Sequence, residues 1–261
     1  QIFSDTLAED TFTTFRTQLQ GRRAIFEANA LVYAEEPDSL VGLWKQRVRW
    51  GRGNVQITQV FRDLWFNRSA HPTMGSWGMA LMWFSIFLMP LFQIGASTGL
   101  IVLYFLNPPA ARRMFTAYWV FSGIVYLIVT MTSFVVDDES AKKSWWEGLL
   151  FPGLISLGVN LYALFPFLFA PLAGVVNPRA HGWTNMAIAL FLYSWLTLSM
   201  LVSYSGKALE GTKFKKLAPI ALYIGGYGSF LCAVTFGSYM KELLGAEMKW
   251  DKTEKTGKVT G

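Results

Sequence analysis

Five long apolar segments constrain the fold of this chain more than any other feature of its sequence. Each has close to the roughly 20 residues that an α-helix needs to cross the hydrocarbon core of a bilayer. They follow one another at residues 79–106, 116–136, 149–176, 184–204 and 217–240. The sequence therefore predicts a mostly α-helical protein, with a bundle of about four to five transmembrane helices over residues 77–240.

Charged residues are rare in these segments and gather at the ends of the chain. They make up 15% of the chain, against about 25% in typical soluble proteins. Residues 1–70 are mixed and polar, and residues 241–261 form a polar tail. We therefore expect an integral membrane protein with a soluble N-terminal part.

The sequence does not predict that each of the five segments crosses the bilayer as a straight helix. Prolines in the first and third, Pro90 and Pro152 among them, favour a kink or a partly interfacial position. The loop at 206–216 contains four lysines, and short Lys-rich loops remain in the cytoplasm. The basic stretch 45–68 is expected on the same side, which four crossings allow. A fifth crossing would place the Lys-containing tail outside, so either one segment does not cross fully or the tail is an exception.

Short elements are predicted ahead of the spans. Phe12, Phe15 and Leu19 recur at helical spacing and predict a helix over 10–20. The run AIFEANALVYA at 24–34 is rich in Ile, Val, Phe and Tyr and predicts one or two short strands.

A second helix is predicted to begin at Pro37, with a polar N-cap at 38–39. Gly51 and Gly53 are expected to interrupt it, because glycine is a poor helix former. A separate amphipathic helix is then predicted over about 54–66. Its basic and aromatic character favours a position in the membrane interface.

Six basic residues and a single acid lie between positions 45 and 68. Such a cluster beside a span suits anionic headgroups or a substrate phosphate, at about 1 kcal/mol per basic residue near an anionic surface. We therefore expect the lipid bilayer or a nucleotide-sugar phosphate as its partner, and no nucleic acid. The basic residues are Lys45, Arg47, Arg49, Arg52, Arg62 and Arg68.

An acidic pair, Glu9-Asp10, stands where the first predicted helix opens. A carboxylate in that place is stabilised in its ionised form by the helix macrodipole and by free backbone N–H groups. Asp10 can therefore act as a general base that takes a proton from a sugar hydroxyl as it attacks an activated anomeric carbon. The alternative is that the two acids only cap the helix.

The stretch Gln46-Arg47-Val48-Arg49-Trp50 has the chemistry to hold a phosphorylated sugar. Arginine offers a planar fork of donors that matches phosphate oxygens. Glutamine adds a neutral donor and acceptor, and tryptophan gives a flat apolar face on which a sugar ring can lie. The alternative is a basic helix on anionic lipid, with Trp50 as an interface anchor.

Taken in this order, the motifs resemble the C-terminal section of a processive family-2 glycosyltransferase. That group includes the cellulose, chitin, hyaluronan and poly-N-acetylglucosamine synthases. Ala8 stands where the family usually has Thr. The motifs cover about 1–55, and the membrane architecture covers the rest. The matching residues are Thr6-Leu7-Ala8-Glu9-Asp10, Gly21, Ala30, the Glu-Glu-Pro-Asp-Ser run at 35–39, and Gln46-x-x-Arg49-Trp50 with Gly53.

The resemblance implies a domain order and a reaction. Residues 1–53 would be the C-terminal remnant of a GT-A (α/β) catalytic domain, and 54–76 an amphipathic interface helix and loop. The spans of 77–240 and the tail of 241–261 would follow. Sugar would pass, with inversion, from a nucleotide-diphospho-sugar donor to a growing polysaccharide acceptor, and the spans would carry the polymer across the membrane.

The resemblance also implies a role for each motif residue. Asp10 would be the general base that deprotonates the acceptor hydroxyl, with Glu9 supporting it. Gln46 and Arg49 would hold the nucleotide diphosphate leaving group. Trp50 would stack under the acceptor sugar at the mouth of the channel.

A divalent metal, Mg²⁺ or Mn²⁺, is implied as well. The metal-binding Asp-x-Asp motif of the family does not occur in this sequence, and Asp137-Asp138 lacks the pattern. We therefore expect the metal ligands upstream of Gln1, in the missing part of a longer protein. On this basis the chain alone is expected not to turn over.

Three functions stay open at this point. The first is a membrane-embedded inverting glycosyltransferase of a bacterial-type plasma (inner) membrane, with its catalytic part in the cytoplasm. The second is a non-processive transferase that acts on a lipid-linked acceptor. The third is a transporter or channel without chemistry, which would leave both motifs unexplained and predict ionisable residues recurring in the spans.

Overall fold

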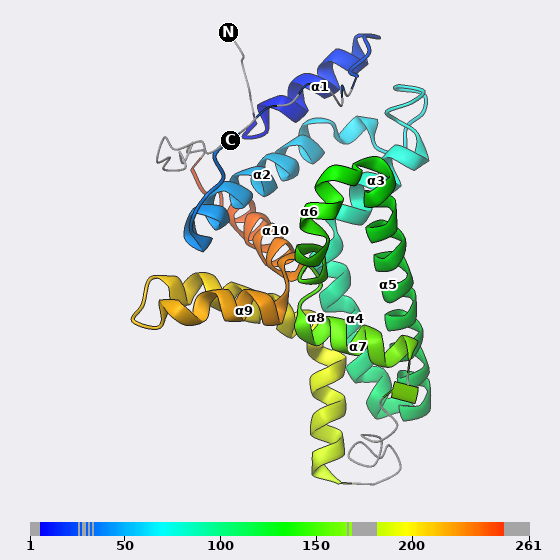
Figure 1. Cartoon of the computed structure of the whole chain (residues 1–261). Coiled ribbons are helices and arrows are strands. Elements are labelled where there is room, and N and C mark those ends of the chain that lie inside the picture. Colours follow the sequence, from blue (N-terminus) through cyan, green and yellow to red (C-terminus); the bar gives the residue numbers. More distant parts are fainter. Residues whose placement is uncertain are drawn as a thin grey trace. The chain divides into compact units, whose positions relative to one another are not determined.

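A computed structural model describes residues 6–25, 27, 30, 32, 34–165, 167–168 and 182–247 (Figure 1). All regular secondary structure in these ranges is helical, as the apolar segments predict. The structure divides into two compact units, one from 1–90 with 231–261 and the other from 91–230. The helices are α1 (Glu9–Leu19), α2 (Leu40–Val60), η1 (Arg62–Leu64), α3 (Trp77–Phe87), α4 (Met89–Leu106), α5 (Pro108–Val136), α6 (Asp138–Leu149), α7 (Leu154–Leu164), α8 (Trp183–Glu210), η3 (Lys215–Leu217), α9 (Ala218–Gly225) and α10 (Tyr227–Leu243).

The first helix is confirmed, but the strands expected after it are not found. In α1, Phe12 and Phe15 are buried in one cluster with Ile57 and Leu64. No strand occurs among the described residues of 24–34, and positions 26, 28, 29, 31 and 33 lie outside the described residues. A strand needs a neighbouring strand to pair its backbone groups, and the described part of the chain offers none.

α2 is a single helix of 21 residues that runs through both glycines, which corrects the predicted interruption. It opens as predicted, because Ser39 is the N-cap and its hydroxyl accepts a hydrogen bond from the Gly42 N–H at 3.1 Å. The two glycines instead mark close approaches. A Cβ on Gly51 would lie 3.0 Å from the Cβ of Ser238, and one on Gly53 would lie 2.7 Å from the backbone N of Ala8.

The separate helix expected over 54–66 is also corrected, since its first part is the end of α2. The short turn η1 follows α2, and an aromatic cluster holds the two together. The Trp65 indole donates to the Thr58 carbonyl at 2.9 Å and stacks on Trp83 of α3, with ring centroids 5.4 Å apart. Phe15 of α1 packs edge-on against Trp83 at 5.6 Å. These contacts pack α1 against η1 and α3 through aromatic side chains.

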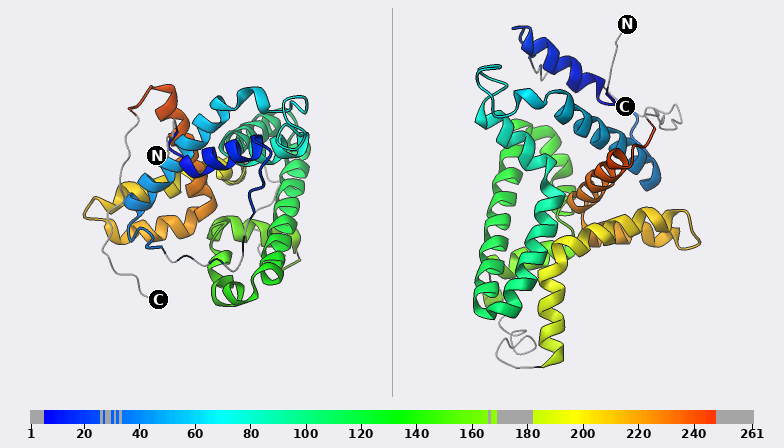
Figure 2. Two further views of the ribbon diagram at one scale, coloured as in Figure 1. Left: turned by 90° about the horizontal axis from the view of Figure 1, so that it is seen from above. Right: turned by 180° about the vertical axis from the view of Figure 1, so that it is seen from behind.

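The second unit contains most of the apolar helices. Figure 2 shows α4 and α5 running antiparallel beside each other after the sharp turn at Asn107, whose side chain caps α5. Leu100, Phe115 and Trp195 belong to the buried core of this unit. Among the described residues, three helices are long and apolar enough to span a bilayer: α4, α5 and α8. The count rises to five if each of two bent helix pairs, α6–α7 and α9–α10, is one span.

The two bent pairs break at glycines that touch each other. α6 and α7 meet at an angle of 91° with Pro152 in the break, which agrees with a kink, one of the two alternatives for the third segment, and α9 gives way to α10 at Gly226. Gly153 and Gly226 have φ of +85° and +90°, where an L side chain is strained. A Cβ on Gly153 would lie 2.6 Å from the N of Gly226, and the Gly228 N–H donates to the Phe151 carbonyl at 3.0 Å. The break between α6 and α7 and the break between α9 and α10 therefore contact each other through their backbones.

Candidate active site

The acidic pair forms the first turn of α1. Ala8 is the N-cap and makes no side-chain capping bond, so neither acid is the cap of the helix. Glu9 and Asp10 follow as its first two residues. Asp10 is exposed, and its Oδ1 accepts from the N–H of Thr11 at 2.7 Å. A solvent-facing carboxylate at the positive end of a helix is well placed to act as a base.

The backbone just ahead of the pair is docked on α2. The Leu7 N–H donates to Oε1 of Gln56 at 2.8 Å, in a buried contact. Ala8 lies directly against Gly53, as the close approach described above requires. Phe12 continues the buried face of α1 one turn later. The acids are therefore held by backbone contacts while their own side chains stay outside the core.

The second motif lies along the middle of α2. Val48 is its buried member, and Trp50 is 42% exposed. The guanidinium carbon of Arg47 lies 4.0 Å from the centroid of the Trp50 ring, as expected for an (i, i+3) cation–π pair. Arg47 thus orients the indole and leaves much of it open to a flat ligand.

Gln46 keeps part of its hydrogen-bonding capacity unused. Its Nε2 donates to Oε2 of Glu36 at 3.5 Å. Its Oε1 is buried and has no hydrogen-bond partner within the described structure, and neither has Nε of Arg47. Buried polar atoms in proteins are nearly always paired. A ligand with both donors and acceptors would complete these groups.

α2 brings the two motifs together. Arg49 and Gly53 are four residues apart and so lie on one face, separated by about 6 Å along the helix axis. Because Ala8 sits on Gly53, the start of α1 docks one turn beyond Arg49 and Trp50. The arrangement places an acidic helix terminus beside a group of cationic and aromatic side chains.

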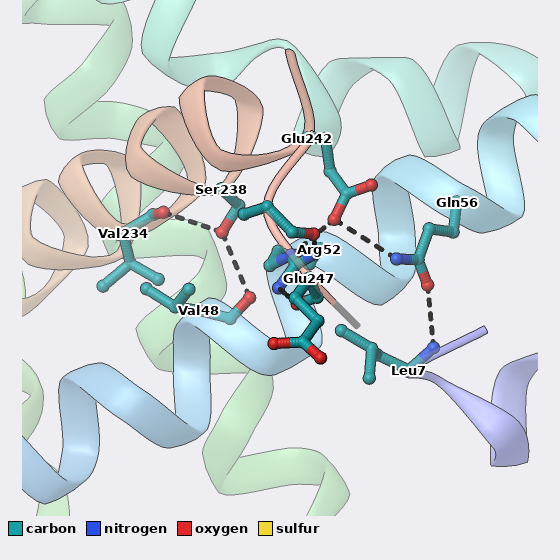
Figure 3. Close-up of polar contacts among 9 residues, drawn as sticks. Leu7, Val48, Arg52, Gln56, Val234, Ser238, Glu242 and Glu247 are labelled. Carbon is teal, nitrogen blue, oxygen red and sulfur yellow. Dashed lines mark hydrogen bonds and ion pairs between the residues drawn. The ribbon is translucent and has the colours of Figure 1, made fainter. Parts of the chain in front are cut away.

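Two polar residues of this region, Gln56 and Glu242, were not singled out by sequence reasoning, and a third, Arg52, was given a different environment. Arg52 was expected to face lipid or phosphate, but it is only 6% exposed and forms an ion pair with Glu242 (Figure 3). Gln56 Nε2 also donates to Glu242, at 3.2 Å. No local pattern could have revealed this, because 190 residues separate Arg52 from its partner.

The described residues offer no metal site. No group of three or more His, Cys, Asp or Glu side chains in them is arranged to hold an ion. The Mg²⁺ or Mn²⁺ implied by the resemblance was expected on ligands upstream of Gln1, and that expectation stays a prediction.

Comparisons with known proteins identify one matching family and a few partial relatives. Residues 1–205 match the family described as glycosyl transferase family group 2. The chain is similar to a poly-beta-1,6-N-acetyl-D-glucosamine synthase of Staphylococcus aureus strain COL, with 37% identity over 54 residues. A synthase of the same name from Staphylococcus epidermidis is 34% identical over 62 residues.

These alignments are short. They cover 21% and 24% of this chain, and only 13% and 15% of the two synthases. No solved structure matches the chain.

Proposed function

The chain belongs to glycosyl transferase family group 2, as its motifs indicate, and from this we propose that it forms the acceptor side of a membrane polysaccharide synthase. The donor is a nucleotide-diphospho-sugar, and the acceptor is the end of a growing polysaccharide. One observation carries the proposal. The exposed Asp10 sits on a helix whose start is docked within one turn of Arg49 and Trp50.

The proposed reaction is a single displacement with inversion. Asp10 takes the proton of the acceptor hydroxyl as that oxygen attacks the anomeric carbon. The bond from this carbon to the diphosphate breaks, and its electron pair leaves with the diphosphate. Gln46 and Arg49 hold the departing phosphates, and Glu9 supports Asp10 as the neighbouring residue of the acidic pair.

Trp50 supports a processive version of this reaction. Trp50 is 42% exposed and its ring packs against the Arg47 guanidinium, so it offers the flat surface that a polymerase needs to keep its product between additions. The apolar helices would then pass the product across a bacterial-type plasma membrane. A non-processive transfer to a lipid-linked acceptor is the competing proposal.

Two further parts of the proposal concern what surrounds the site. Residues 1–53 are proposed to complete a GT-A catalytic domain, which the docking of α1 on α2 supports. A requirement for Mg²⁺ or Mn²⁺ is assigned to ligands outside the described residues.

The test uses the complete natural protein in membranes. Labelled UDP-N-acetylglucosamine, UDP-glucose and UDP-glucuronate are supplied in turn with Mg²⁺ or Mn²⁺. We expect high-molecular-weight product from one donor, and its loss in Asp10→Asn. Asp63→Asn, which neutralises an exposed carboxylate on η1, is the matched control and is expected to keep full activity.

The same assay separates the competing proposals. If the label enters only short lipid-linked species, the non-processive proposal replaces the processive one. Transfer that is as fast in Asp10→Asn as in the unmodified protein would contradict the role of Asp10. A protein that transfers sugar from none of the donors would contradict the proposed function.

A further inference from the structure

The C-terminal end of α10 is built around a buried arginine from α2. Arg52 donates through Nε to the Glu242 carboxylate, through Nη1 to the Glu247 carbonyl at 3.0 Å, and through Nη2 to the Ala246 carbonyl at 2.6 Å (Figure 3). Buried guanidinium groups are rare unless they are paired in this way. Arg52 therefore binds both the Glu242 carboxylate and the backbone carbonyls of Ala246 and Glu247.

The segment that Arg52 binds, at the end of α10, forms a defined turn. α10 ends in a Schellman turn, with the Ala246 N–H donating to the Lys241 carbonyl at 3.0 Å and the Gly245 N–H to the Glu242 carbonyl at 3.1 Å. This turn presents the carbonyls of 246 and 247 to the guanidinium. A cation at the negative end of a helix is also favoured by the macrodipole.

Glu242 extends the network to the acidic motif. Its carboxylate accepts from Nε2 of Gln56 at 3.2 Å, and Oε1 of Gln56 accepts from the Leu7 N–H at 2.8 Å. The amide of Gln56 is thus oriented by a carboxylate on one side and a backbone donor on the other. Leu7 lies two residues before Glu9, so the network ends at the start of the proposed catalytic helix.

α10 also contacts the second motif directly. The Ser238 hydroxyl shares its proton between the Val234 carbonyl of its own helix at 2.9 Å and the carbonyl of Val48, within the Gln46–Trp50 stretch, at 3.2 Å. Gly237 lies against the Trp44 ring, to which an added Cβ would come within 3.3 Å. α10 therefore contacts the second motif through Ser238 and is linked to the acidic motif through Glu242 and the bridging amide of Gln56.

We propose that Arg52, Glu242 and Gln56 are positioning residues, which use the end of α10 to hold the acidic motif in register with Gln46–Trp50. This inference rests on the proposed function, because the alignment of the acidic motif with Gln46–Trp50 is assumed to serve sugar transfer. It predicts that the end of the chain's last described helix sets the turnover rate without touching substrate.

The test is a double-mutant cycle in the complete membrane protein. Arg52→Met, Glu242→Met and the double variant are compared for kcat and donor KM. We expect kcat to fall about 100-fold in each, since a misplacement of about 1 Å in a catalytic group has that effect. Donor KM should change less than about threefold, and the double variant should be no worse than either single variant, because the pair acts as a unit.

Two further variants sharpen the cycle. Glu242→Gln keeps an acceptor for Arg52 and is expected to restore much of the lost kcat. Gln56→Glu places a carboxylate against Glu242 and should lower kcat as Arg52→Met does. The control is the exposed pair of Lys143 and Glu139 in α6, 2.7 Å apart, whose methionine variants are expected to leave kcat unchanged.

A second readout does not depend on turnover. Spin labels at the exposed positions Thr13 of α1 and Lys45 of α2 report the register of the two helices directly. We expect the distance distribution to broaden in Glu242→Met and to stay narrow in Glu139→Met. An unchanged distribution, or an unchanged kcat in a folded Arg52→Met protein, would overturn the proposal. A broadened distribution in a protein without transferase activity would support the positioning network and contradict the proposed function.

Discussion

The hydroxyl of Ser238 shares its proton between the carbonyl of Val234, one turn earlier in α10, and that of Val48, a residue 190 positions earlier in the chain. Ser238 also leaves no space for a side chain at Gly51. A Cβ added to Gly51 would overlap the hydroxyl and lie 3.0 Å from the Ser238 Cβ. α10 thus packs against the backbone of α2, and small residues on both helices make the contact possible.

Gly51→Ala is expected to destabilise the protein by about 1–3 kcal/mol, the usual effect of overpacking. The measurement is thermal unfolding of the purified protein in detergent. Gly78→Ala in α3 is the control, since nothing lies within 4 Å of its Cβ position and alanine favours helix. Equal stability of the two variants would show that α10 does not rest on Gly51.

Gly53→Ala should affect transfer more than stability. Its Cβ would lie 2.5 Å from the Cβ of Ala8 and 2.7 Å from that residue's backbone N, which cannot rotate away. The start of α1 must then shift, and we expect turnover to fall about 100-fold. Sugar transfer and thermal unfolding are measured on the same preparations. A variant with normal turnover would contradict the docking of the acidic motif on α2.

Trp83→Phe should loosen the base on which α1 rests. The Trp83 indole donates to the hydroxyl of Thr58 at 2.9 Å, and phenylalanine cannot. We expect a loss of about 1 kcal/mol in the free energy of unfolding. Thr58→Val should have a similar effect, and the two together should be less than additive. Additive losses would mean that the hydrogen bond does not form.

Gly226→Ala is expected to prevent folding of the second unit. The residue has φ of +90°, and its Cβ would lie 2.5 Å from the carbonyl carbon of Pro152. Strain and overlap together should amount to about 3 kcal/mol or more. The yield of monodisperse protein after detergent extraction reports the effect. Gly211→Ala, with open space around it, should extract normally.

Trp50→Ala should shorten the polymer rather than abolish transfer. Losing an aromatic contact of about 0.5–1.5 kcal/mol raises the acceptor KM by about two- to tenfold. Product length is measured by gel filtration of labelled polymer. Trp50→Phe keeps a flat ring and serves as the control. Products of normal length in Trp50→Ala would remove the support for processivity.

Several features of the fold follow from local patterns. The spacing of Phe12 and Phe15 predicts α1, and Ser39 caps α2 as a polar residue after Pro37 should. The apolar segments predict four to five spans, and the described helices give three to five. These elements depend on residues within a few positions of one another, which is why they can be read from the chain.

The sequence by itself thus determined the helical membrane class, the two motifs and, through them, the family. Only the tertiary structure decided what Gly51 and Gly53 do, because the roughly 1 kcal/mol that glycine costs a helix is outweighed by the packing it permits. The tertiary structure also decided which group Arg52 binds, since its charge could have faced lipid, phosphate or protein. The partner Glu242 is 190 residues away, and a contact between such distant residues exists only after the chain has folded.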